Sequence, residues 1–437
     1  MARDDSTADG LTRRGWMKRG GIAVASGLVA GCTASSSGGG DGVGSEAGTG
    51  SGADDRTQSP TGTSAQGRTT HSGSYSVAIE PVGSVEFERP PERIVGGWGF
   101  VADVLMALGH ADSIVGLSRP GFWYQGFYEH LPSVEPRNVD EIPNTVSKSY
   151  SVKQELLYEL DPDLLATDPN RFIASYQLEP SKVSTLATDV APFFGNLSRS
   201  KRAPSWPNWP DGKSYRYYSI PEFVERYGRV VGERDRASAM IDLYERTMDD
   251  ITSRVPPKGD RPSVGLLSAF TNPENKGYFG VIDPIPKLDK TYELKQYGDL
   301  GVVDAFADEY DSENAHYDLK LGMEGLLDVD PDVLVFDEAV NALGGNNVYG
   351  NANAYEGMLE LLRTDPVGKQ LTAVKNDRLY PGGTGSQGPI INLFQTEMLA
   401  KQLYPDEFGA WHGLGEIPAN ERLFDRQRLA DIINGFL

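Results

Sequence analysis

A chain of 437 residues is too long for a single hydrophobic core, so its length predicts two compact domains with additional terminal segments. The 62 acidic residues outnumber the 41 basic ones and give a net charge of -21, which disfavours a nucleic-acid partner because phosphates would repel the surface. The one cysteine, Cys32, excludes disulfides within the chain, and the five scattered histidines disfavour a histidine-built metal site.

The first 32 residues have the order of an export signal. Arg13 and Arg14 precede an apolar stretch, Gly20 to Gly31, that is too short to span a bilayer and ends at Cys32. The arginine pair resembles a twin-arginine signal, and the residues ending at Cys32 resemble a lipobox, whose cysteine is lipidated. A basic tail with a chance arginine pair is the alternative. We expect a protein exported and anchored to the outer face of the cell membrane.

Residues 33–73 are rich in Ser, Gly, Thr and Asp and carry almost nothing apolar, so they predict a disordered linker. The dispersed acidic excess, with few lysines, also resembles that of halophilic proteins.

Residues 74–218 predict an N-terminal lobe of α/β type. Strands are expected at 76–79, 85–87, 93–96, 113–117, 163–166 and 190–194, with helices at 101–108 and 156–160. Gly97, Gly99 and Ala102 match a dinucleotide fingerprint between a strand and a helix. A simple tight turn is favoured, because the next strand ends in Ser118-Arg119 and not in an acid that could hold a ribose.

One helix-strand motif occurs twice. Glu155–Asp168 and Glu324–Asp337 share seven of fourteen positions without a gap, and each has an Asp-Pro pair between an apolar helix and a buried run. The recurrence predicts two lobes of one architecture, although any two parallel-sheet domains would each contain such a unit.

Aromatic and basic residues follow the ends of several predicted strands, where α/β folds bind ligands. The loop 195–218 adds a basic, indole-rich patch suited to an anionic and partly aromatic ligand. Capping of the core is the alternative for the aromatic residues, and a solvated surface excursion is the alternative for the loop. The candidate ligand-binding residues are Trp98, Phe100, Arg119, Trp123, Tyr124, Arg171, Phe193, Arg199, Phe270 and Tyr278.

Residues 219–256 predict a helical connection. Ser219 and Glu222 form a capping box, and a helix over 233–254 would be about 33 Å long, enough to cross between lobes. Residues 257–437 predict a C-terminal lobe. Its expected elements are strands at 263–267 and 378–380, a glycine-rich turn at 381–388 that lacks the lysine of a phosphate loop, and helices at 355–362, 389–403 and 422–436.

Residues 75–437 resemble the substrate-binding proteins of ABC importers for ferric siderophores, haem and cobalamin (periplasmic-binding-protein class III). The resemblance rests on Arg93-Ile94-Val95 leading into Ala102–Gly109, on both Asp-Pro-Asp segments, on the long helix, and on the stretches Leu371–Tyr380 and Leu403–Gly409. It implies two Rossmann-like lobes joined by a single long helix, with the ligand in the cleft between them.

The resemblance also implies a function without catalysis. A glutamate on each lobe, here Glu155 and Glu324, would dock onto the ABC permease dimer, which works with its ATPase. The alternative for these acids is the preference of carboxylates for helix starts. Arg119, Arg171 and the cluster near Arg199 favour a ferric siderophore as ligand, with cobalamin or haem as alternatives.

We therefore expect a monomer with no nucleic-acid partner and no cofactor or metal held by the protein itself, since Fe³⁺ would arrive within the ligand. An exported redox enzyme and a surface sensor or adhesion module are the competing hypotheses.

Overall fold

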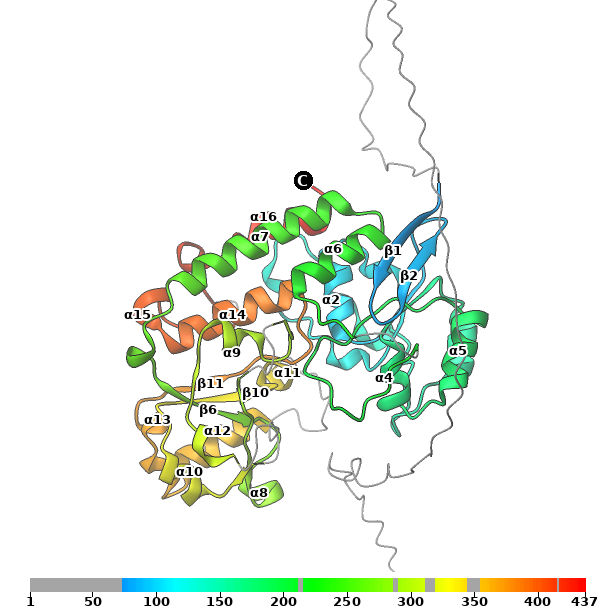
Figure 1. The fold of residues 1–437 in the computed structure, drawn as a ribbon. Helices are drawn as coiled ribbons and strands as arrows, with labels where there is room; N and C mark the ends of the chain where they lie inside the picture. Colours follow the sequence, from blue (N-terminus) through cyan, green and yellow to red (C-terminus); the bar gives the residue numbers. More distant parts are fainter. Residues whose placement is uncertain (1–72, 211–214, 286–289, 311–318, 344–353, 415) are drawn as a thin grey trace, which may run out of the picture. The chain divides into compact units, whose positions relative to one another are not determined.

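The computed structural model describes residues 73–210, 215–285, 290–310, 319–343, 354–414 and 416–437, and it is an α/β protein with two parallel sheets, as predicted (Figure 1). The export signal with Arg13, Arg14 and Cys32 and the linker lie outside the described residues, apart from Gly73. In the part of the chain that is described, no helix combines the length and the apolar character needed to cross a membrane.

The N-terminal lobe contains a three-stranded parallel sheet in the order β4-β3-β5. Gly96 at the end of β3 pairs with Leu117 of β4 and with Ala166 of β5, so the three carboxyl ends meet at one edge. The strands are β3 (Ile94–Gly96), β4 (Ile114–Leu117) and β5 (Leu164–Ala166), preceded by the antiparallel hairpin of β1 (Tyr75–Ile79) and β2 (Gly83–Phe87). The helices of this lobe are α2 (Gly99–Ala107), α3 (Gln154–Leu160), α4 (Pro169–Ala174) and α5 (Pro180–Asp189).

The C-terminal lobe contains a four-stranded parallel sheet in the order β11-β10-β6-β8. Its strands are β6 (Ser263–Ser268), β8 (Val303–Asp304), β10 (Val333–Asp337) and β11 (Leu379–Pro381), and a small hairpin is formed by β7 (Phe279–Gly280) and β9 (Lys320–Leu321). The helices are α8 (Pro273–Lys276), α9 (Lys295–Asp299), α10 (Met323–Val329), α11 (Ala339–Leu343), α12 (Ala354–Thr364), α13 (Thr372–Lys375), α14 (Pro389–Leu403), α15 (Pro405–Phe408) and α16 (Arg426–Asn434).

The connection between the sheets consists of two helices, α6 (Ile220–Val230) and α7 (Arg234–Ser253). Ser219 and Glu222 form the predicted capping box at the start of α6. The 20 residues of α7 make a rod of about 30 Å, which packs against α6, α14 and α16 (Figure 1).

Both copies of the repeated motif have the same local structure. Leu157 of α3 and Leu326 of α10 are buried, and each helix ends at an aspartate with a left-handed backbone, Asp161 with φ of 42° and Asp330 with φ of 47°. The proline that follows each aspartate prevents the helix from continuing, so the chain turns directly into the next strand, the edge strand β5 in one lobe and the interior strand β10 in the other.

Helix α14 is buried along its whole length and is capped by a residue of the other lobe. The Asp103 carboxylate of α2 accepts hydrogen bonds from the backbone N–H groups of Ile390 (3.1 Å) and Ile391 (3.2 Å). It also accepts one from the Tyr128 hydroxyl (2.6 Å), which in turn accepts from the Trp123 indole N–H (2.7 Å). The carboxylate thus satisfies donors at the helix N-terminus that would otherwise be buried without partners.

Glycine is required at position 388 because α14 starts so close to Asp103. A Cβ atom on Gly388 would lie 2.6 Å from the Asp103 Oδ2 atom and 3.0 Å from the Phe100 carbonyl oxygen. Any larger residue would therefore push the start of α14 away from its cap.

Several sequence predictions need correction. The position of Asp168–Arg171 after the strand 163–166 predicts a loop, but Asp168 caps α4 there. Residues 190–194 form no strand but one isolated bridge between Leu165 and Phe193. The last helix starts at Arg426 and not at Arg422, because Asp425 caps it. The sequence also predicts a loop at 270–279, after the strand 263–267, and an Asn- and Gly-rich loop from Asp337 to Asn353. The first contains α8, and the second begins with α11 before it reaches residues 344–353, which lie outside the described part.

The Asp103 cap should make stability depend on pH. Burial raises the pKa of Asp103 to about 7, although hydrogen bonds from Tyr128 and from α14 act in the opposite direction. Because the folded-state pKa lies above the unfolded value, the folded protein binds more protons, and stability present at acidic pH is lost as pH rises through about 7. The substitution Asp103→Asn should remove this pH-dependent part of the free energy of unfolding, which changes by up to about 1.4 kcal/mol per pH unit.

The measurement is the free energy of unfolding of both proteins at pH 5, 6, 7 and 8. Asp425→Asn is the matched control, since the Asp425 carboxylate also caps a helix but is exposed. A difference between wild type and Asp103→Asn that stays constant across this range would contradict the assignment.

Candidate functional site

The order of the N-terminal sheet brings three chain segments to one place. Trp98 follows the central strand β3, Arg119 follows β4, and Arg171 lies on α4, which follows β5. Asp168 starts α4 by accepting a hydrogen bond from the Asn170 N–H group (2.9 Å), and Pro169 occupies the first helical position. The site is thus built at the carboxyl edge of a parallel sheet, where α/β folds bind ligands.

Three guanidinium groups surround the indole ring of Trp98. The Cζ atoms of Arg171, Arg199 and Arg119 lie 3.7, 5.3 and 6.0 Å from the ring centroid. These distances allow cation-π attraction, which offsets part of the repulsion between the like charges. A cluster of cations in a protein of net charge -21 is a local exception to the acidic surface.

Arg171 is a buried cation without an acidic partner among the described residues. The residue is 6% exposed, and its Nε donates to the Tyr176 hydroxyl (3.1 Å). The nearby Asp168 carboxylate accepts from the Tyr215 hydroxyl (2.7 Å) instead, and no ion pair links it to Arg171. A buried charge without a counter-ion is costly, so this guanidinium is prepared for an anion that arrives with the ligand.

Arg119 has a strained backbone and stacks between two aromatic rings. Its φ is 59°, an uncommon value for a residue other than glycine. The guanidinium carbon lies 4.0 Å from the Phe122 ring centroid and 4.7 Å from that of Tyr150, and Nη1 donates to the Tyr150 hydroxyl (3.0 Å). Tyr150 is 45% exposed and was not among the predicted residues, because it lies far along the chain from any strand end.

The predicted loop 195–218 contributes Arg199, which is ion-paired with Glu293 of the C-terminal lobe. The backbones of the two segments are also joined, since the Tyr292 N–H donates to the Ser198 carbonyl (3.0 Å) and the Glu293 N–H donates to the Arg199 carbonyl (2.8 Å). The loop thus forms part of the contact between the lobes.

The C-terminal lobe closes the other side of the site. Tyr292 stacks on Phe100 with ring centroids 4.0 Å apart and ring planes 6° from parallel. The Trp98 indole N–H donates to the Ser386 hydroxyl of the glycine-rich turn. Between these contacts lies a narrow crevice. Its lining residues are Gly97, Trp98, Phe100, Val101, Thr167, Asp168, Arg171, Gly195, Asn196, Leu197 and Tyr292.

Acidic groups lie behind Arg199 at the carboxyl end of β10. Burial and the neighbouring Glu338 raise the pKa of Asp337 well above its usual range. Burial also raises the pKa of Glu338, although its carboxylate accepts a hydrogen bond from the Gly385 N–H (3.0 Å). These two carboxyl groups lie near Arg199 but do not line the crevice, whose residue from the C-terminal lobe is Tyr292.

Most of the predicted aromatic residues lie in the core. Trp123 is fully buried and donates to Tyr128, Tyr124 packs edge-on against Phe127 at 4.9 Å, and Phe193 packs against Phe172 at 5.6 Å. Phe270 and Tyr278 are partly exposed, and Lys320 lies 4.4 Å from the Tyr278 ring centroid. Of the predicted set, the structure groups Trp98, Phe100, Arg119, Arg171 and Arg199 at one place.

The glycine at position 97 has a steric role. A Cβ atom there would lie 2.2 Å from the Thr167 Oγ1 atom, so only glycine lets the ends of β3 and β5 approach this closely. This contact accounts for the first glycine of the fingerprint-like motif as part of a tight turn.

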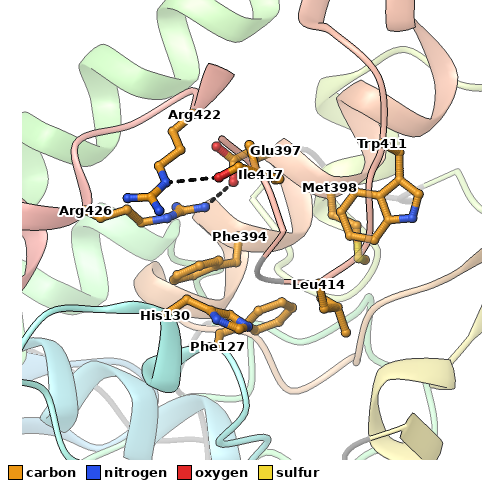
Figure 2. Close-up of a pocket in the computed structure, with 10 residues that line it drawn as sticks. All are labelled: Phe127, His130, Phe394, Glu397, Met398, Trp411, Leu414, Ile417, Arg422 and Arg426. Atoms are coloured by element: carbon orange, nitrogen blue, oxygen red, sulfur yellow. Dashed lines mark hydrogen bonds and ion pairs between the residues drawn. The ribbon is translucent and has the colours of Figure 1, made fainter. Parts of the chain in front are cut away.

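A second pocket lies beside α14, at His130 and the segment before α16, and Figure 2 shows its lining. Arg426 is ion-paired with Glu397, and the Arg422 Nε donates to the Ile417 carbonyl (3.4 Å). Because the buried guanidinium and carboxylate neutralise each other, this pocket is less suited to an anion than the site at Trp98. The other lining residues are Phe127, His130, Phe394, Met398, Trp411 and Leu414.

Comparisons with known proteins identify the family. A family model described as "Periplasmic binding protein" matches residues 94–383. A search of curated proteins finds no match.

Two solved structures share the fold at low sequence identity, and a third aligns less closely. A periplasmic solute binding protein from Veillonella parvula aligns with a TM-score of 0.51 at 14% identity, covering 77% of this chain and 88% of that one. CeuE from Helicobacter pylori, solved as a Ni-His complex, aligns with a TM-score of 0.50 at 16% identity. The alignment covers 83% of this chain and 99% of CeuE. The iron uptake ABC transporter substrate-binding protein PiuA from Streptococcus pneumoniae aligns with a TM-score of 0.48 at 16% identity. The alignment covers 75% of this chain and 96% of PiuA. The chain belongs to the periplasmic binding protein family of solute-binding proteins.

Proposed function

We propose that this chain is an extracytoplasmic substrate-binding lipoprotein of an ABC importer, which captures a ferric siderophore and delivers it to the membrane permease. The observation that carries the proposal is the buried guanidinium of Arg171, stacked on Trp98 and without an acidic partner among the described residues. Such a group gains most from a ligand that brings its own negative charge.

The surroundings of Trp98 match the chemistry of an anionic iron chelate. Arginine pairs with the carboxylate, catecholate or hydroxamate oxygens that bind iron, and an exposed aromatic ring such as Tyr150 offers a stacking surface. Of the predicted ligand-binding residues, Arg119, Arg171 and Trp98 are therefore the groups that we assign to ligand contact, with Arg199 beside them. No bond is made or broken in this function.

The delivery step assigns a role to the repeated motif. Glu155 and Glu324 are exposed, and each lies in the first turn of its helix, α3 and α10. Matched acids on two lobes suit arginines on two subunits of a permease dimer. The lipid on Cys32 and the linker would keep the binding domain close to that permease.

Substitution Arg171→Gln should weaken binding of a ferric siderophore about 10- to 100-fold, because a charge-assisted contact of about 1.5–3 kcal/mol is lost. Trp98 reports binding directly, so the measurement is a titration of tryptophan fluorescence with ferric siderophores, haem and cobalamin. Arg229→Gln is the control, since Arg229 makes an exposed ion pair with Glu225 on α6.

Equal affinities of wild type and Arg171→Gln for every ferric siderophore would contradict the assignment of Arg171. The absence of a fluorescence change with all three ligand classes would contradict the proposed function.

The double substitution Glu155→Lys and Glu324→Lys should abolish uptake by cells while leaving ligand affinity within about two-fold, because exposed charges far from the site contribute little to it. Radioactive iron uptake and fluorescence titration measure the two effects. Glu159→Lys and Asp328→Lys, exposed on the same helices, form the matched control. Unchanged uptake in the double variant would favour a sensor or adhesion module over a transport protein.

A further inference from the structure

The ion pair between Arg199 and Glu293 places a carboxylate of the protein on one of the three site arginines. The two side chains are 19% and 8% exposed, so water screens their attraction only weakly. The Arg199 guanidinium lies over the same Trp98 ring as that of Arg171. Glu293 therefore occupies a position that an anionic group of a ligand could take.

Four further contacts hold the segment that carries this carboxylate in place. The backbone hydrogen bonds that join residues 198–199 to 292–293 fix the segment against the loop. Tyr292 stacks on Phe100, and its carbonyl accepts a hydrogen bond from the Gln387 side chain (2.6 Å). Glu293 is thus held by its neighbours at the site and is not a mobile surface group.

The other two acids near Arg199 in the described part of the chain, Asp337 and Glu338, make no ion pair with it. Glu338 accepts hydrogen bonds from the Gly385 N–H (3.0 Å) and from the Asn341 side chain, and neither it nor Asp337 is within ion-pair distance of Arg199 among the described contacts. Of these carboxylates, Glu293 makes the direct ion pair.

We infer that Glu293 is a specificity-determining residue, which acts as an internal carboxylate ligand of Arg199 and limits the negative charge that the site accepts. The inference rests on the proposed function. With Arg199 neutralised, Arg119 and Arg171 are the cations left for the ligand, so the site suits a chelate of low negative charge. A more highly charged chelate must displace Glu293 or remain beside it, and both cost free energy.

Iron chelates of different charge make this testable. Three catecholate groups carry six negative charges and give a ferric complex of charge -3, whereas three hydroxamate groups give a neutral complex. The substitution Glu293→Gln removes the internal charge but keeps the shape of the side chain. It should strengthen binding of a ferric tris-catecholate about ten-fold or more and change binding of a ferric tris-hydroxamate by less than about two-fold.

The gain should depend on Arg199. In an Arg199→Gln background, the further change Glu293→Gln should no longer favour the tris-catecholate, since no guanidinium remains to be released. If Glu293 acted only in folding, its substitution would change the affinities for both chelates together, and this change would not depend on Arg199. Asp299→Asn is the matched control, because Asp299 forms a similarly buried ion pair with Lys295 on α9.

The outcomes separate the two proposals. A wild-type protein that binds neither chelate would overturn the proposed function and this inference with it. The inference alone would be overturned if the wild type binds a chelate but Glu293→Gln does not prefer the tris-catecholate over the tris-hydroxamate more strongly than the wild type does. Unfolding midpoints of all variants check that each protein is folded under the conditions of the titration.

Discussion

The arrangement of the two lobes depends on one carboxylate. Asp103 of α2 accepts hydrogen bonds from the first turn of α14, a helix that follows it by almost 300 residues and is buried along its length. A buried helix start needs acceptors for its N–H groups, and the negative charge also interacts favourably with the helix dipole. Asp103 pairs in turn with Tyr128, which follows the end of β4. The same residue thus links the cap of α14 to the segment that carries the site.

The site follows from the order of the strands. Because β3 lies between β4 and β5, the segments that follow the three strands meet at one edge of the sheet. These segments carry the indole of Trp98 and the guanidinium groups of Arg119 and Arg171. The loop 195–218 adds a third cation and reaches the C-terminal lobe through Arg199. The site therefore combines three cations around one indole ring with a carboxylate of the C-terminal lobe on one of those cations.

Much of this fold was predictable from the sequence, and the reason is local. The Asp-Pro pairs, the capping box at Ser219 and the alternating apolar runs each determine their own segment, so β1, β2, α6, α12 and α14 occur where they were expected. The site was predictable only in part. The ends of the predicted strands identified Trp98, Arg119 and Arg171. Tertiary packing, which no short sequence pattern contains, determines the burial of Trp123 and Phe193, the ion-pair partner of Arg199 and the position of Tyr150. The placement of Asp168 as a helix cap was missed because a loop and a short helix start have the same residue types.

The central claim is that the cations around Trp98 capture an anionic iron chelate. Mass spectrometry of the ligand that co-purifies with the protein from native membranes tests it most directly. We predict a bound molecule with the isotope pattern of iron, a net negative charge and oxygen donor groups. A bound cobalamin, or a molecule without iron or negative charge, would contradict the account.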